Sequence, residues 1–145
     1  MGRYPRYLPP TERGSTLVEI TCRTVQGRRL LRPDTRLKRR MAGVFARAQE
    51  LYPTPIYNLN ALSSHYHLDA GFDDVGHQRD YLQHVQSNLA REVGRLHDWR
   101  APVWSRRYRS IPVAETDEDQ IRRFRYTLEQ DCSSYCTSFR CGTIG

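Results

Sequence analysis

Residues 56–72, IYNLNALSSHYHLDAGF, lie near the middle of the chain and carry its clearest fold signal. The stretches 56–62 and 64–72 both have the composition of β-strands, with a tight connection near Ser63. In the second stretch, His65, His67 and Asp69 share one face, and the residues between them share the other. We therefore predict a β-hairpin whose second strand turns two histidines to the same side.

A helix is predicted on each side of this hairpin. Residues 35–51 place apolar side chains at helical spacing after Asp34, a residue type that caps helix N-termini. Pro53 and Pro55 end that helix. Residues 77–97 carry a second apolar stripe at the same spacing and form the second predicted helix.

Further outward, each helix is flanked by a predicted strand. Residues 15–25 alternate, with Val18, Ile20 and Cys22 on one face and Leu17, Glu19, Thr21 and Arg23 on the other. Residues 103–113 form the last predicted strand, whose Pro112 indicates an edge position. The order β-α-β-β-α-β predicts an α+β, ferredoxin-like fold: a four-stranded antiparallel sheet with helices on one face.

Three segments follow from this pattern. Residues 1–14 are predicted to be an irregular basic arm, residues 15–130 a folded domain, and residues 131–145 an irregular tail. The sequence of the tail is DCSSYCTSFRCGTIG. Its apolar residues recur neither at helical nor at strand spacing, and it looks like a truncated or frameshifted end. Its three cysteines lack a fourth ligand at the spacing that a structural metal site requires.

The charge of the chain is uneven. The 145 residues carry a formal net charge of +7, with +8 in residues 1–50 and −1 in the remainder. This asymmetry favours a polyanionic partner such as nucleic acid, although a GC-rich genome would also explain the excess of arginine. Arg36, Arg39 and Arg40 lie on the outer face of the first predicted helix and are candidate DNA contacts. No membrane-spanning or signal-like stretch is present, so we expect a cytoplasmic protein without a membrane partner.

The sequence His65-Tyr66-His67 is the sharpest local motif. Residues two apart in a strand point to the same side, so both imidazoles can be directed at one point. Two imidazoles at this spacing form a good pair of metal ligands, but a His-x-His triplet also occurs by chance and then lines a polar face.

A second constellation lies on the last predicted helix, near residues 117–130, which opens with a Thr116–Asp119 capping box. Tyr126 and Gln130 are one turn apart on one side of it. The opposite, buried side is predicted to hold Ile121, Phe124 and Leu128, and three arginines flank the tyrosine: Arg122, Arg123 and Arg125. A tyrosine beside guanidinium groups suits attack on a phosphodiester, although an ordinary boundary tyrosine would look the same. A metal that polarises the phosphate would assist such a nucleophile, and Gln130 offers a neutral oxygen ligand.

Together, the His65-Tyr66-His67 and Tyr126-x-x-x-Gln130 motifs resemble the single-tyrosine HUH transposases. The branch most similar is that of the REP-associated tyrosine transposases, which are insertion-sequence-200-like enzymes. The stretches STLVEITCRTVQGRRLL and VWSRRYRSIPV also resemble the family, so the likeness extends over about residues 15–130.

This resemblance implies a DNA transposase that cleaves and rejoins single-stranded DNA through a 5′-phosphotyrosine intermediate. It implies Tyr126 as the nucleophile and His65, His67 and Gln130 as ligands of Mg²⁺ or Mn²⁺. The arginines that flank the tyrosine would contact DNA. The implied partner is single-stranded or hairpin DNA, and the implied assembly is a monomer or a homodimer.

Two other functions remain open at this stage. The short tail favours a non-catalytic single-stranded nucleic-acid-binding module, either a decayed or a domesticated transposase. An unrelated ferredoxin-like RNA-binding protein is disfavoured, because such proteins expose aromatic side chains on their central strands, where this chain has His65 and His67.

Overall fold

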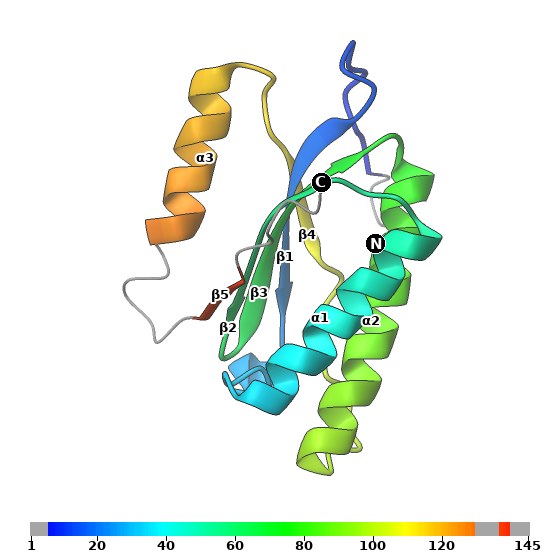
Figure 1. Ribbon diagram of the computed structural model, residues 1–145, viewed down its shortest axis with the longest axis vertical. Coiled ribbons are helices and arrows are strands. Elements are labelled where there is room, and N and C mark those ends of the chain that lie inside the picture. Colours follow the sequence, from blue (N-terminus) through cyan, green and yellow to red (C-terminus); the bar gives the residue numbers. More distant parts are fainter. Residues whose placement is uncertain (1–5, 130–136, 140–145) are drawn as a thin grey trace.

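The computed structural model describes residues 6–129 and 137–139. The elements, in chain order, are β1 (Thr16–Arg23), the short 3-10 turn η1 (Val25–Gly27), α1 (Thr35–Leu51), β2 (Ile56–Leu62), β3 (His65–Phe72), α2 (Val75–His97), β4 (Arg109–Pro112), α3 (Asp117–Glu129) and β5 (Thr137–Phe139). They form three layers (Figure 1), in which α1 and α2 cover one face of the sheet and α3 lies over the other.

The sheet has the strand order β4-β1-β3-β2-β5, and every neighbouring pair is antiparallel. Because β3 lies between β1 and β2, and β1 lies between β3 and β4, the helices α1 and α2 connect strands that are not neighbours. This is the split βαβ arrangement of the ferredoxin-like fold. The predicted fold class is therefore confirmed, with a short fifth strand added at the β2 edge.

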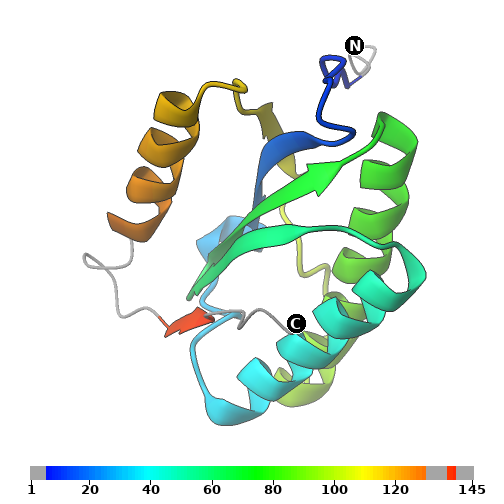
Figure 2. The same ribbon diagram turned by 45° about the horizontal axis from the view of Figure 1, so that its top comes forward.

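Strand alternation divides the sheet into an apolar face and a polar face. The apolar face packs against α1 and α2, and its central strands contribute fully buried side chains: Val18, Ile20, Tyr66, Leu68, Ala70 and Phe72. Leu37 and Met41 of α1, with Leu82 and Leu89 of α2, complete this core. The opposite face of β1 and β3 is polar and lies under α3 (Figure 2).

Side-chain caps set where α1 and α2 begin. The Asp34 carboxylate accepts a hydrogen bond from the Leu37 amide at 2.8 Å, as the sequence predicts, and α1 has its predicted bounds. The Asp74 carboxylate caps α2 in the same way by accepting from the His77 amide at 2.8 Å. This second cap starts α2 two residues before the predicted position 77.

The strand predicted over 103–113 is interrupted. Arg109–Pro112 pair with β1, and Trp104 forms an isolated antiparallel bridge with Thr24, but residues 106–108 lie outside the ladder. Val103 and Tyr108 are both buried in the core although they are five residues apart. An unbroken strand would turn them to opposite faces, so the chain between them must leave the sheet. Trp104 anchors this excursion: its indole donates to the Gln86 carbonyl at 3.0 Å.

The buried side predicted for α3 is also wrong. Ile121 and Leu128 are 55% and 51% exposed, and Thr127 is the buried residue of the helix. The reason is that α3 packs against the polar face of the sheet, where the Asn60 amide donates to the Thr127 carbonyl at 3.4 Å. Apolar side chains on α3 therefore gain little by turning inward.

The predicted irregular tail contributes β5, which pairs with β2 through Thr137–Phe139. The remainder of that tail, with its cysteines, lies outside the described residues, as does Gln130. Among the helices described, none is long and apolar enough to span a membrane.

Candidate active site

The register of β1 and β3 gathers polar side chains on the face beneath α3. Thr21 pairs with His67 across the strands, and Glu19 pairs with Asp69. The His65 and His67 rings lie edge to face, with centroids 5.0 Å apart and planes at 82°. The predicted placement of both imidazoles on one side of the strand is thus what the structure shows.

Both histidines are held by neighbouring hydroxyl groups. His67 is buried, and its Nδ1 shares a hydrogen bond of 3.1 Å with the Thr21 hydroxyl. His65 is half-buried, and its Nδ1 lies 3.3 Å from the Ser64 hydroxyl. Burial lowers the pKa of His65, and the charge of Arg23 lowers it further. His65 is therefore neutral near pH 7, the state in which imidazole binds a metal.

Two carboxylates lie beside this pair. Glu19 Oε1 is 3.9 Å from His67 Nδ1, and the Asn58 amide donates to Asp69 at 3.1 Å. Burial raises the pKa of Asp69 to about 6, although the Asn58 hydrogen bond opposes the rise and Glu19 adds to it. The floor of the site therefore combines imidazoles with buried acid groups.

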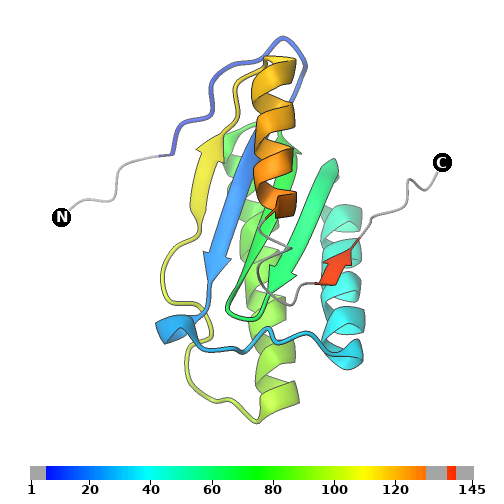
Figure 3. The ribbon, with the colours of Figure 1, turned by 90° about the vertical axis from the view of Figure 1, so that its left-hand side faces the viewer.

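Tyr126 reaches this floor from α3. Its side chain, 50% exposed, lines one cavity of about 470 Å³ together with His65 and His67. Figure 3 shows α3 lying across the sheet face that carries these strands. Residues separated by about sixty positions in the chain thus meet in one cavity.

Arginines surround the cavity, but none of them is among the DNA-contact candidates that the sequence singled out. The cavity is lined by Arg23, Arg106, Arg107 and Arg109. The alternation of β1 does place Arg23 on the correct face. No local pattern identifies the other three, because they come from the excursion before β4 and from its first residue.

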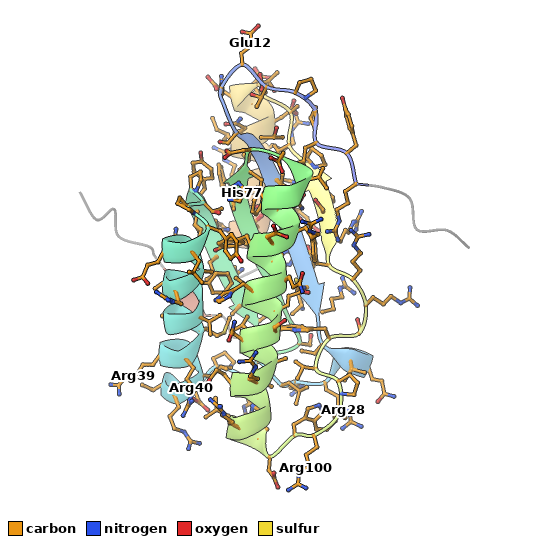
Figure 4. The ribbon with its side chains drawn as sticks, turned by 90° about the vertical axis from the view of Figure 1, so that its right-hand side faces the viewer. Glu12, Arg28, Arg39, Arg40, His77 and Arg100 are labelled. Atoms are coloured by element: carbon orange, nitrogen blue, oxygen red, sulfur yellow. The ribbon has the colours of Figure 1, made fainter. Side chains whose placement is uncertain are left out.

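The predicted DNA-contacting arginines fall into two groups. Arg36, Arg39 and Arg40 are exposed on α1, which lies on the other side of the sheet from α3; Figure 4 labels Arg39 and Arg40 on this helix. On α3, Arg125 is exposed and lies beside Tyr126, and Arg122 pairs with Asp119 at 3.5 Å. Arg123 instead turns inward and forms an ion pair with buried Glu19.

The side chains present suit a divalent ion only in part. Within residues 6–129 and 137–139, no group of three His, Cys, Asp or Glu side chains is arranged to hold a metal ion. His65 and His67 supply two imidazoles side by side, which fits the nitrogen half of a mixed nitrogen–oxygen ligand set. Further ligands would have to come from oxygen donors such as an amide, water or a phosphate.

The fold, with a tyrosine-bearing helix above the strand that carries two histidines, can be compared with known proteins. No family model matches the sequence, and no curated protein matches it. Among solved structures, a REP-associated tyrosine transposase bound to a REP hairpin matches with a TM-score of 0.70 at 15% identity, over 92% of this chain and 74% of that one. A candidate transposase from Deinococcus radiodurans R1 matches with a TM-score of 0.55 at 14% identity, over 87% and 96% of the two chains. The resemblance seen in the sequence is confirmed as a shared fold.

Proposed function

We propose that this chain is a DNA transposase that cleaves and rejoins single-stranded DNA with Tyr126 as its nucleophile. The observation that carries the proposal is the shared cavity, in which a half-exposed tyrosine and two histidines lie among four arginines. The similar transposase structure bound to a REP hairpin supports DNA, and hairpin DNA in particular, as the partner.

In the proposed reaction, the Tyr126 oxygen forms a bond to the phosphorus and the bond to the 3′ oxygen breaks. The phenol proton passes to water, and the departing 3′ oxygen takes up a proton to become a hydroxyl group. The 5′-phosphotyrosine ester keeps the energy of the phosphodiester, so a second strand's 3′ hydroxyl can reverse the step without a nucleotide cofactor. The arginines at the cavity rim would bind the flanking phosphates bidentately.

We further propose that His65 and His67, with Gln130 as the third ligand, hold Mg²⁺ or Mn²⁺. When bound, the ion would polarise a phosphate oxygen and stabilise the charge that develops on it. Two features of the chain support the histidine part: the hydrogen bond between the Thr21 hydroxyl and His67 Nδ1 orients the His67 ring, and the lowered pKa keeps His65 neutral.

The test is incubation of the full chain with single-stranded hairpin oligonucleotides and Mn²⁺, followed by denaturing gels. We expect a protein–DNA adduct in the parent chain and none in Tyr126→Phe. Tyr57→Phe is the matched control, because Tyr57 is also an exposed tyrosine but does not line the cavity. His67→Ala should abolish the adduct, and Gln130→Ala should weaken it less, since water can replace an amide oxygen.

Two results would contradict this mechanism. An adduct that persists in Tyr126→Phe would place the nucleophile elsewhere. A parent chain that binds the oligonucleotide but forms no adduct at any Mn²⁺ concentration would favour the second candidate, a non-catalytic single-stranded DNA-binding module. That candidate is favoured by the two-histidine site, for which the described residues supply no third His, Cys, Asp or Glu.

A further inference from the structure

The helix that carries Tyr126 is attached to the sheet by few contacts. Thr127 is its buried residue, and the Asn60 hydrogen bond to the Thr127 carbonyl is a long one, at 3.4 Å. The Tyr57 and Phe124 rings meet with centroids 6.4 Å apart. A cavity of about 140 Å³ lies beside Phe124, between α3 and the strands. Apolar packing of this extent is a weak constraint on where Tyr126 lies.

One ion pair stands out among the attachments of α3. Glu19 of β1 is 5% exposed, and the Arg123 side chain is 32% exposed, so the pair lies at the interface between sheet and helix. A buried carboxylate without its cation is strongly disfavoured, whereas a paired one is tolerated. Because Glu19 stands on a central strand, the pair ties α3 to the rigid part of the sheet.

The same carboxylate also faces the histidines. Its second oxygen, Oε1, lies 3.9 Å from His67 Nδ1, while Arg123 contacts Oε2. Arg123 precedes Tyr126 by three residues, so the two share one side of the helix, with the guanidinium 6.0 Å from the ring centroid. Glu19 is thus a direct link between the histidine strand and the tyrosine helix.

We propose that Glu19 and Arg123 are positioning residues that hold α3 so that Tyr126 faces His65 and His67. The inference rests on the proposed function only for its consequence in the reaction; the attachment of α3 itself is a separate property. It assigns Arg123 a buried partner on the sheet, whereas Arg122 pairs with Asp119 of its own helix and Arg125 lies on the exposed side.

Two measurements on the full chain test this proposal. The first is hydrogen–deuterium exchange of the α3 amides, without DNA or metal. Arg123→Met and Glu19→Gln should each speed exchange in α3 by about tenfold or more, with exchange in α2 unchanged. Arg125→Met is the matched control: it removes the same charge from an exposed position of the same helix and should leave α3 exchange within about twofold.

The second measurement is the rate of adduct formation against the affinity for the hairpin oligonucleotide. Arg123→Met should lower the rate constant of adduct formation by about tenfold or more. The Kd for the oligonucleotide should stay within about twofold of the parent value. Arg123→Lys should form the adduct faster than Arg123→Met but more slowly than the parent chain, because lysine keeps the charge but not the planar guanidinium.

The outcomes distinguish the positioning role of Arg123 from the proposed transposase activity. Unchanged α3 exchange in Arg123→Met overturns the positioning role, whatever the activity. Weakened oligonucleotide binding with unchanged exchange would show that Arg123 contacts DNA instead. A parent chain that forms no adduct would refute the proposed function, yet the exchange experiment would still decide how α3 is held. If Glu19→Gln does not fold, Arg123→Met gives the answer alone, since Arg123 is only partly buried.

Discussion

Two surfaces of the molecule carry exposed arginines, and each is a candidate site for DNA binding. One triple variant, Arg106→Ala/Arg107→Ala/Arg109→Ala, removes three exposed cations at the rim of the candidate active site. A second, Arg36→Ala/Arg39→Ala/Arg40→Ala, removes three from α1 on the other side of the sheet. Both lower the net charge by three, so a difference between them reports position and not total charge.

The expected size follows from counterion release. Each phosphate neutralised on a single strand contributes about −0.7 to the slope of log K against log salt, so three contribute about −2. If the three contacts contribute nothing to affinity at 1 M salt, that slope means that they raise the affinity at 0.15 M salt by roughly 50-fold. We expect the rim variant to lose this amount and to show a correspondingly flatter salt dependence.

The α1 variant should change the slope far less. Its arginines are separated from the cavity by the sheet and by a helix layer about 10 Å thick, which exceeds the Debye length of about 8 Å at physiological salt. Removing Arg40 does not leave its partner Glu92 unpaired, because Arg95 also contacts Glu92, at 2.9 Å. We therefore expect this control to keep the parent fold.

Fluorescence anisotropy of a labelled single-stranded oligonucleotide, titrated at several KCl concentrations in EDTA, measures both slopes without cleavage. A slope that flattens as much in the α1 variant as in the rim variant would refute the assignment of the binding surface. So would a rim variant that binds like the parent.

Two further outcomes follow from single side chains. Thr21→Val removes the hydroxyl that holds His67 Nδ1 and should lower the affinity for Mn²⁺ by about 10- to 100-fold without unfolding the chain. Calorimetric titration with Mn²⁺ measures this affinity, and an affinity equal to that of the parent would contradict the role of Thr21. Burial raises the pKa of Cys22 to about 11, so the thiol stays protonated and only about one in a thousand is thiolate at pH 8. With Cys132, Cys136 and Cys141 replaced by serine, iodoacetamide labelling should be slow at pH 8 and rise about tenfold per pH unit toward 11; rapid labelling at pH 8 would show that Cys22 is accessible.

Local patterns predict most of the elements in this chain. Helix α1 has its predicted bounds because its apolar period, its Asp34 cap and the following prolines are all short-range signals. Strand β2 also has its predicted bounds, 56–62. The segment 103–113 is not one continuous strand, because the burial of Val103 and Tyr108 depends on the shape of the core and not on strand alternation.

For α3, local patterns predict the helix but not which of its side chains are buried. An apolar stripe predicts a buried side only if the surface that it meets is apolar, and α3 meets the polar face of the sheet. Ile121 and Leu128 are therefore exposed, while the polar side of the helix faces Asn60 and Glu19. Nothing near α3 in the sequence identifies that partner surface.

The sequence by itself determined which side chains share a face of β1 and β3 and of each helix, because the periods of the two structures depend only on local backbone geometry. It thereby placed His65 beside His67 and Glu19 beside Thr21. Only the tertiary structure decided that these two pairs are neighbours, that Tyr126 and the rim arginines share their cavity, and that Arg123 pairs with Glu19. Strand order and register depend on contacts between residues far apart in the chain, and the burial that makes the Glu19–Arg123 pair matter exists only once those contacts have formed.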